Sequence, residues 1–335
     1  MRYAREVLRE WDSQVTILAP RRHLRGIAGH VWEQLALPAL ARSRLQPRQQ
    51  GVLWSPANMG PLAISRQVLT IHDLSPLDHP EWFAPAFALW YRQVLPILAR
   101  RVRRVLTPSG FSRGRIIQRL NLPAEKISVV PPGVDPALFH PADSAVVRAR
   151  YGLAETYLLF VGSLEPRKNL PALLSAWERV GPRFSAVELV IVGGRSPVFR
   201  RALPRQGKTL LPAHVRFLGA VPDSDLPALY SGAAAVVLPS LYEGFGLPVI
   251  EAMACGTPVI SSRMGALAET AAEAAILVDP VDSEALARAI EQILRDDGLR
   301  AELRERGIER AAYFAWRETA GRIWTLLQAE AENDG

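Results

Sequence analysis

Short runs of apolar and β-branched residues recur along the chain, and stretches with helical spacing of their apolar positions separate them. This alternation is typical of parallel sheets whose strands are joined by helices. The predicted strands lie at residues 15–18, 68–71, 102–107 and 127–130, and then at 157–161, 187–192, 215–218, 234–238 and 257–261. We therefore expect an α/β protein with two doubly wound, Rossmann-like parallel sheets.

The strand pattern restarts near residue 157, after a segment in which prolines and a glycine disfavour a helix or a central strand. This segment reads Pro131-Pro-Gly-Val-Asp-Pro-Ala-Leu-Phe-His-Pro141, and we place the domain junction at about residues 131–145. Apolar spacing predicts helices over residues 2–11, 84–99 and 283–310, and a final helix over residues 311–329.

Composition describes an ordinary folded chain and excludes several classes of protein. Of the 335 residues, 49% are hydrophobic and 22% are charged, which excludes a disordered chain. Cys255 is the only cysteine, so an intrachain disulfide and a cysteine-rich zinc site are excluded, and a small packing residue is expected there. No signal sequence and no apolar run long enough to cross a bilayer is found. We expect a cytoplasmic protein.

The net charge of +7 is distributed unevenly between the two halves. Residues 1–150 carry 21 Lys and Arg against 10 Asp and Glu, a net charge of +11, whereas the remainder carries 19 against 23, a net charge of −4. A basic half can meet a phosphorylated substrate, an anionic membrane or nucleic acid. Nucleic acid is disfavoured because no aromatic and basic RNA motif or zinc-finger spacing accompanies the charge.

The most informative segment runs over residues 233–260, where a buried strand, a glycine-containing loop and the start of a helix follow one another. Free N–H groups and the helix dipole attract phosphate at such a helix start. Glu243 in the loop and Glu251 inside the helix add carboxylates, which accept hydrogen bonds from sugar hydroxyls. The sequence Gly244-Phe-Gly246 is not a dinucleotide fingerprint, which disfavours a hydride-transfer enzyme.

A second candidate segment follows the strand at residues 157–161. That strand ends at Gly162, and Arg167 and Lys168 come where the next helix begins. Cations at this place oppose the helix dipole, which indicates that they serve a ligand. A planar guanidinium and a compact ammonium can neutralise a diphosphate without a metal, so we expect no metal and no cofactor.

A third candidate lies in the first half, in Val68-Leu-Thr-Ile-His-Asp-Leu74. His72 and Asp73 stand at the carboxyl end of a predicted strand, the edge at which open α/β sheets bind ligands. Taken alone, such a pair is more often a structural turn than a binding site. Ser109 and Ser112, after the next strand, are expected first of all to cap a helix.

Together these segments resemble the retaining, nucleotide-sugar-dependent glycosyltransferases of family 4, over about residues 2–328. The matching motifs are Thr70-Ile-His-Asp-Leu74, Val129-Val-Pro-Pro-Gly-Val-Asp135, Phe160-Val-Gly-Ser-Leu-Glu-Pro-Arg-Lys-Asn169, Val215-Arg-Phe-Leu-Gly219 and Glu243-Gly-Phe-Gly-Leu-Pro-Val-Ile-Glu251. The resemblance implies the GT-B architecture, in which two Rossmann-like domains face a central cleft. It implies an acceptor-side domain over residues 1–140, a nucleotide-sugar-binding domain over 141–312 and a C-terminal helix over 313–335 that returns to the first domain.

The resemblance also implies roles for individual residues. Glu251 would hold the ribose hydroxyls, and Glu243 with the following loop backbone would address the donor sugar. Arg167 and Lys168 would bind the diphosphate, and His72 would lie beside the reacting sugar. The implied catalytic residues are His72, Glu243, Arg167 and Lys168. The implied donor-binding residues are Gly162, Arg167, Lys168, Glu243, Gly244, Phe245, Gly246, Leu247 and Glu251. Asp73, Ser163 and Val221 are further candidate site residues, and the segment 217–221 would lie near the base.

The expected reaction is the retaining transfer of a hexose or deoxyhexose to a saccharide or lipid-linked acceptor in surface polysaccharide synthesis. The stretch from His72 to Trp82 resembles mannosyl- and rhamnosyltransferases, which makes GDP-mannose the first donor to test. An oxocarbenium-like transition state would be stabilised where the diphosphate departs. A lipid-linked acceptor would bring the basic half against an anionic membrane.

Two departures from the family pattern keep alternatives open. Ser163 stands where many members have an arginine, and the helix over residues 2–11 resembles the one that follows the family's first strand and glycine-rich loop, which this sequence lacks. A start codon placed too late and an impaired protein are the two explanations. The alternatives to a transferase are a binding-only or N-terminally truncated pseudoenzyme and a GT-B sugar-nucleotide epimerase.

Overall fold

The chain forms two compact units, each built around one sheet. The computed structural model describes residues 2–11, 15–20, 22, 24, 26–44, 51–194 and 212–332. Unit 1 consists of Met1–Asp78, Ala86–Gly133 and Trp316–Gly335, and unit 2 of His79–Pro85 and Val134–Ala315. Both sheets are parallel, which confirms the predicted α/β class with two Rossmann-like sheets.

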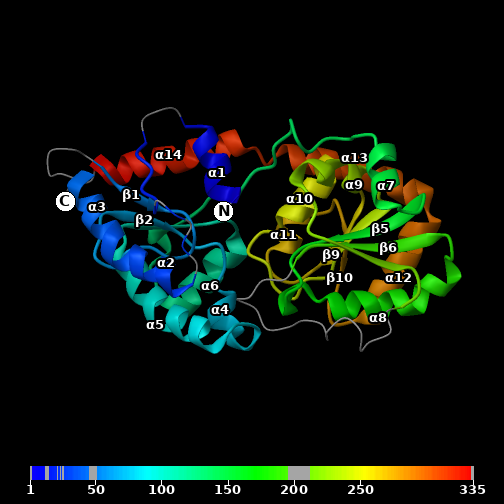
Figure 1. Cartoon of the computed structure of the whole chain (residues 1–335), viewed down its shortest axis with the longest axis horizontal. Coiled ribbons are helices and arrows are strands. Elements are labelled where there is room, and N and C mark those ends of the chain that lie inside the picture. The colour runs from blue at the N-terminus through cyan, green and yellow to red at the C-terminus, as the bar shows by residue number, and fades with distance from the viewer. Residues whose placement is uncertain are drawn as a thin grey trace. The chain divides into compact units, whose positions relative to one another are not determined.

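The sheet of unit 1 has the strand order β1-β2-β3-β4 (Figure 1). Its strands are β1 (Leu53–Ser55), β2 (Gln67–Thr70), β3 (Arg104–Thr107) and β4 (Ile127–Val129). All four residues of β2 are buried, which explains why that strand is a continuous apolar run rather than an alternating one. The apolar side chains beneath it come from β2, β3 and two long helices, and include Leu69, Val105, Leu95, Leu98 and Ile116.

The helices of unit 1 include three that were predicted from apolar spacing, α1, α5 and α14. The helices in this unit are α1 (Arg2–Arg9), α2 (Ile27–Val31), α3 (Leu37–Arg44), α4 (Ser75–Asp78), α5 (Pro85–Arg101), α6 (Gly110–Leu120) and α14 (Trp316–Glu332), and a π-helical turn, Trp32–Ala36, joins α2 to α3. The Oγ of Ser109 accepts a hydrogen bond of 3.1 Å from the backbone N–H of Ser112, which confirms the expected helix cap at the start of α6.

The strand predicted at residues 15–18 was wrong. The structure shows no regular secondary structure there, and Ile17 is 67% exposed. An apolar run becomes a strand only if a neighbouring strand satisfies its backbone, and none of the described strands pairs with this one. The sheet instead begins at β1, whose three residues were too few to be recognised from the pattern.

The sheet of unit 2 has the strand order β10-β9-β8-β5-β6-β7. Its strands are β5 (Thr156–Val161), β6 (Val187–Val192), β7 (Val215–Gly219), β8 (Ala235–Leu238), β9 (Val259–Ser262) and β10 (Ile276–Val278). The chain runs outward from β5 through β6 to β7, and then resumes on the other side of β5 with β8. The carboxyl ends of β5 and β8 therefore lie at a topological switch point, where open α/β sheets bind ligands.

Helices cover both faces of this second sheet, with α8 and α12 on one side and α9, α10 and α13 on the other (Figure 1). The helices of unit 2 are α7 (Ala145–Tyr151), α8 (Leu170–Val180), α9 (Leu226–Ser231), α10 (Leu247–Ala254), α11 (Leu267–Ala271), α12 (Ser283–Arg295) and α13 (Asp297–Ala312). The helical spacing over residues 283–310 is divided into two helices because Asp296, in extended conformation, caps α13 through the backbone N–H of Leu299.

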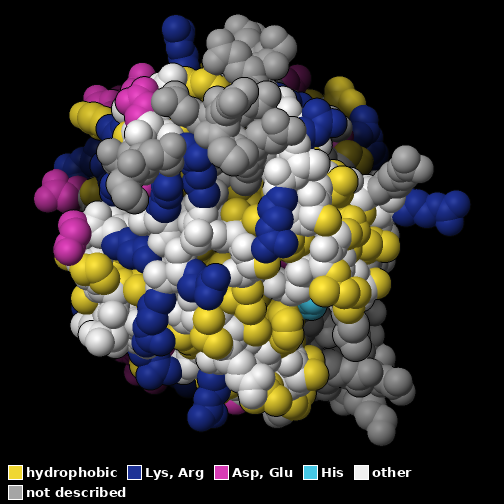
Figure 2. All heavy atoms as spheres, turned by 90° about the vertical axis from the view of Figure 1, so that its left-hand side faces the viewer, with side chains coloured by type: hydrophobic (Ala, Val, Ile, Leu, Met, Phe, Trp, Pro, Cys, Tyr) yellow, Lys and Arg dark blue, Asp and Glu magenta, His cyan; other side chains and the backbone are white. Residues whose placement is uncertain are grey.

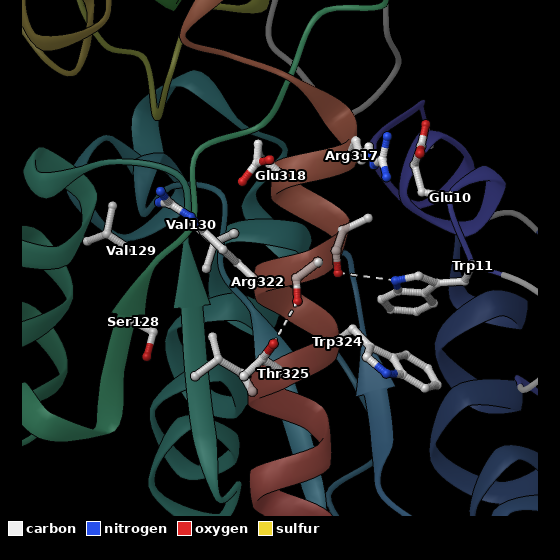
Figure 3. Close-up of a pocket in the computed structure, with 13 residues that line it drawn as sticks. Glu10, Trp11, Ser128, Val129, Val130, Arg317, Glu318, Arg322, Trp324 and Thr325 are labelled. Carbon is white, nitrogen blue, oxygen red and sulfur yellow. Dashed lines mark hydrogen bonds between the residues drawn. The ribbon is translucent and has the colours of Figure 1, made fainter.

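The helix α14 belongs to unit 1, although it begins at residue 316 rather than at 311 as predicted. The rings of Trp316 and Tyr3 lie 5.7 Å apart. The indole N–H of Trp11 donates a hydrogen bond of 3.1 Å to the carbonyl of Ala320, and its ring packs against that of Trp324 at 5.4 Å (Figure 3). Among the residues that the structure describes, no helix is long and apolar enough to cross a membrane.

Three arginines hold the last turn of α14. Arg66 donates to the carbonyl of Ala331, Arg103 to the carbonyl of Glu330, and Arg104 pairs with the Glu330 carboxylate at 2.5 Å. Cations at this end complement the negative end of the helix dipole. Part of the excess positive charge of the first half is therefore used inside unit 1.

Candidate functional site

Two loops of unit 2 meet at the switch point between β5 and β8. The first begins at Gly162 and passes through a 3₁₀ turn, Pro166–Lys168, before α8 starts. The second follows β8 and leads into α10. The backbone N–H of Leu241 in the second loop donates a hydrogen bond of 2.7 Å to the carbonyl of Arg167 in the first. The structure thus joins the two segments that carried the strongest sequence motifs.

Glycines at the strand ends make room for this arrangement. A Cβ on Gly193, whose φ is 146°, would lie 1.8 Å from the carbonyl oxygen of Gly162, so only glycine allows the ends of β5 and β6 to approach so closely. The side chain of Lys168 lies directly over Gly162, because its Cε is 3.4 Å from the place of an added Cβ. The lysine stem is therefore held at the carboxyl end of the central strand.

The carboxylate of Glu243 binds both predicted cations. Its oxygens accept hydrogen bonds from Lys168 Nζ, from Arg167 Nη1 at 2.8 Å and from Ser240 Oγ at 3.1 Å, and its side chain is buried. Burial alone would raise the pKa of Glu243, but the charges of Arg167 and Lys168 outweigh it and lower the pKa to about 2. Glu243 is thus a buried, ionised carboxylate at neutral pH.

A second carboxylate in this cluster was missed by the sequence reasoning. Oε1 of Glu165 accepts hydrogen bonds from Arg167 Nε at 2.9 Å and from Ser163 Oγ at 2.8 Å, and Glu165 is only 1% exposed. Only its position in the motif from Phe160 to Asn169 could have pointed to it, because no sequence pattern distinguishes a single functional glutamate in a polar loop. We call Glu165, Arg167, Lys168 and Glu243 the charge cluster.

The start of α10 follows Glu243 closely in the chain. It has the predicted glycine before the helix and the predicted glutamate inside it. Gly246 precedes the helix with φ of 103°, and a Cβ there would lie 2.5 Å from the Leu267 side chain. Glu251, one turn inside α10, is buried and accepts a hydrogen bond of 3.0 Å from the hydroxyl of Tyr230. The ring of Phe245 is buried against that of Phe314 at 5.3 Å.

The remaining predicted residues of unit 2 do not all join this cluster. Gly244 and Leu247 lie on the same loop and helix start as Glu243. Val221 is half-buried and follows β7, which is separated from β5 by β6. Cys255 is buried at the end of α10, and burial raises the pKa of its thiol to about 12, which agrees with a packing role.

His72 and Asp73 belong to unit 1 and follow β2. A ring nitrogen of His72, Nε2, lies 2.8 Å from the carbonyl oxygen of Pro56, which can only accept, so Nε2 carries the hydrogen. The Tyr3 ring stands edge-on to His72 at 4.8 Å, and burial lowers the pKa of the imidazole. Asp73 accepts hydrogen bonds from the backbone N–H and the hydroxyl of Ser75 and so shapes the turn into α4.

A surface hollow of about 820 Å³ lies elsewhere in unit 1, along α1, α14 and the end of β4 (Figure 3). Its lining includes Trp11, Trp324 and Arg322 but none of the predicted site residues. In the described ranges, no group of three or more His, Cys, Asp and Glu side chains is arranged to hold a metal ion. The candidate chemistry therefore rests on the charge cluster and on His72.

The chain matches two family models that lie one after the other. Residues 148–310 match the model described as glycosyl transferases group 1, and residues 2–138 match glycosyltransferase family 4. The first match contains the whole charge cluster, and the second contains His72.

Curated relatives match the chain over part of their length. The O-antigen chain mannosyltransferase B of Escherichia coli is 35% identical over 263 residues, which are 76% of this chain and 68% of that enzyme. The D-inositol 3-phosphate glycosyltransferase of Frankia alni is 35% identical over 229 residues, 65% of this chain and 56% of that enzyme. The chain thus spans between about half and two thirds of these relatives.

Solved structures of similar fold include sucrose-phosphate synthase from Thermosynechococcus elongatus, with a TM-score of 0.68 and 31% identity over 78% of this chain and 67% of that one. Another is HepE from Anabaena in complex with UDP-glucose, with a TM-score of 0.66 and 25% identity over 78% of this chain and 72% of that one.

Proposed function

We propose that this chain, which belongs to family 4 of the glycosyltransferases, transfers a hexose or deoxyhexose from a nucleoside-diphosphate sugar to a saccharide or lipid-linked acceptor, with retention at the anomeric carbon. Its fold is of the GT-B type, as predicted. Because the chain spans only part of its curated relatives, its activity, donor and acceptor remain proposals, supported by its own residues and by its similarity to those relatives.

The observation that carries the proposal is the charge cluster at the switch point of unit 2. Arg167 and Lys168 lie in one 3₁₀ turn, and Glu243 comes from the loop that leads into α10. A diphosphate bound there would meet two cations and the N-terminal end of a helix, all of which stabilise negative charge on a leaving group. This supports cleavage of a sugar–diphosphate bond.

The other residues are assigned in keeping with this chemistry. The buried carboxylate of Glu251, held by Tyr230, would receive the ribose hydroxyls, and Glu243 with the backbone of Gly244, Phe245 and Gly246 would address the donor sugar. His72 would act beside the reacting sugar as a neutral imidazole whose Nε2 is committed to Pro56. The diphosphate oxygen would take the acceptor proton as it departs.

GDP-mannose is the first donor that we propose. The similarity to an O-antigen chain mannosyltransferase supports mannose as the transferred sugar, and we propose a surface polysaccharide or its lipid-linked precursor as the acceptor. The complex of HepE with UDP-glucose supports a nucleotide sugar as the donor class and keeps UDP-glucose in the test.

The test is a donor panel with a matched variant. The chain and its Glu251→Ala variant are incubated with GDP-mannose and with UDP-, dTDP- and ADP-sugars, with EDTA present, and nucleoside diphosphate release and thermal shift are measured. We expect release and a raised melting temperature with one donor, and loss of both in the variant. Binding by none of the donors contradicts the proposal, and binding without release, with acceptors supplied, favours the binding-only alternative.

We also infer that the protein works in the cytoplasm with unit 1 touching the anionic inner face of the membrane, where a lipid-linked acceptor would lie. The helix α5 contains no acidic residue, and after its first two residues the exposed positions are Leu89, Arg92, Gln93, Ile97, Arg100 and Arg101. Leu89 is 53% and Ile97 51% exposed, so apolar side chains stand between arginines on one side of the helix. Lys and Arg side chains lie scattered among apolar patches on the face in Figure 2. This combination favours an anionic lipid surface.

A further inference from the structure

The two carboxylates that hold Arg167 are attached to it in different ways. Glu165 and Arg167 lie two residues apart around a single 3₁₀ turn. The backbone N–H of Glu165 donates to Ser163 at 2.9 Å, and its carbonyl accepts from Lys168 at 3.1 Å. Glu243 reaches the same guanidinium from a loop 76 residues further along the chain. Glu165 is therefore held by the same turn that carries Arg167, whereas Glu243 is carried by a separate loop.

The hydrogen bonds of Glu165 fix the position of the Arg167 guanidinium but leave one of the two carboxylate oxygens of Glu165 without a partner. Arg167 Nε and Nη2 both lie 2.9 Å from the same oxygen, Oε1, instead of forming two parallel bonds to both oxygens. The other oxygen, Oε2, is buried and has no hydrogen-bond partner. An unsatisfied buried carboxylate oxygen is destabilising, and a group that keeps one commonly serves a purpose other than stability.

The charges of the cluster cancel while Glu243 is in place. Two carboxylates, Glu165 and Glu243, face two cations, Arg167 and Lys168. A neutral cluster attracts a diphosphate weakly, and a diphosphate carries more negative charge than one carboxylate. If Glu243 is displaced, the pair of cations keeps one fixed carboxylate and gains a net positive charge, which favours the diphosphate.

We propose that Glu165 is a positioning residue that holds the Arg167 guanidinium for the β-phosphate of the donor, whereas Glu243 occupies the phosphate's place on Arg167 and Lys168 until the donor displaces it. This inference rests on the proposed function. It assigns opposite effects to two carboxylates that touch the same arginine. Glu165 assists diphosphate binding, and Glu243 competes with it and becomes free to meet the donor sugar.

The test compares a nucleoside diphosphate with its monophosphate, because only the diphosphate carries the group in question. Dissociation constants for GDP and GMP, or for the nucleotide that the donor panel selects, are measured by calorimetry on the full chain. We expect Glu165→Gln to weaken GDP binding about 10-fold with less than about 2-fold effect on GMP, because the loss of orientation of the Arg167 guanidinium outweighs the gain in net positive charge. We expect Glu243→Gln to strengthen GDP binding.

Asp225→Asn is the matched control, because Asp225 is also a buried carboxylate of unit 2 and pairs with Arg150 at 2.8 Å and with Tyr151 at 2.7 Å. It should lower the melting temperature and leave the GDP to GMP ratio unchanged. Glu165→Asp, which keeps the charge but is shorter by one methylene, should fall between the native chain and Glu165→Gln. It replaces Glu165→Gln if that variant does not fold.

The possible results separate this inference from the function on which it rests. An unchanged GDP to GMP ratio in the Glu165 variants, or weaker GDP binding in Glu243→Gln, overturns the inference while the function stands. A native chain that binds no nucleoside diphosphate overturns the proposed function and the inference with it.

Discussion

The ion pairs of Glu243 give the protein a stability that depends on pH. A carboxyl with a lower pKa in the folded than in the unfolded chain stabilises the fold above its unfolded pKa and loses that effect as the pH falls through the folded value. For Glu243 the two values are 4.5 and about 2. Its contribution is therefore complete above about pH 4.5 and disappears toward pH 2.

The corresponding prediction concerns Glu243→Gln, which removes the titrating group. The difference in free energy of unfolding between the native chain and the variant should shrink as the pH is lowered from 6 to 3. Urea titrations at several pH values measure this difference. A difference that stays constant over this range would mean that Arg167 and Lys168 do not hold the Glu243 carboxylate in solution.

His72 leads to a second prediction about pH, for a side chain that is neutral in the folded protein rather than ionised. Burial lowers the pKa of its ring, and the contact with Pro56 assigns the hydrogen to Nε2. Nitrogen-detected NMR of labelled histidine should therefore show one neutral, Nε2-protonated ring at pH 7. Since the folded pKa lies below the unfolded value of 6.5, His72 should cost the fold stability as the pH falls below 6.5. His72→Gln should flatten this dependence, and a charged ring at pH 7 would contradict the assignment.

At the scale of elements, the sequence predicted strands well where they are buried on both faces. The positions of β5, β6 and β8 agree with the apolar runs, because a central parallel strand is apolar throughout. The three-residue strands β1 and β10 carry too little pattern, and residues 15–18 carry the pattern without a partner strand.

The residues of the candidate site were likewise predictable where the sequence has a recognisable local pattern. Glycines, Arg167, Lys168, Glu243 and Glu251 were predicted because strand, loop and helix start have recognisable composition. Glu165 was not, because its importance lies in a buried contact with a side chain two residues away. Which carboxylate faces which cation depends on the three-dimensional meeting of two loops, and no spacing in the sequence encodes that.

The helix α14 supports a prediction about stability at this scale. Trp316 is buried and lies against Tyr3 of α1, so Trp316→Ala removes a large apolar side chain from the contact between the two helices. We expect a loss of about 3 kcal/mol in the stability of unit 1. Calorimetry or hydrogen exchange measures this loss of stability. Thr325→Ala is the control, because Thr325 is an exposed residue of the same helix. Exchange that is unchanged in α1 would show that α14 does not support that helix.

At the scale of the whole molecule, the uneven charge allows a test of the proposed contact with an anionic membrane. The exposed arginines and apolar side chains of α5 should bind vesicles that contain anionic lipid, and salt should weaken the binding because exposed charges are screened. Replacing Arg92 and Arg101 by Gln should reduce co-sedimentation, while charge-conserving lysines should largely keep it. Binding that does not depend on anionic lipid content would contradict the membrane proposal.

The place of α14 also sets the order in which the units can be completed on the ribosome. Residues 134–315 of unit 2 emerge from the exit tunnel before α14 does, whereas unit 1 waits for residues 316–332. Until then the nascent chain presents Tyr3 and Trp11 without the helix against which they pack. Such aromatic surface is what chaperones bind on growing chains. The aromatic face of α1 is thus made before residues 134–315 of unit 2, and the helix that packs on it is made after them.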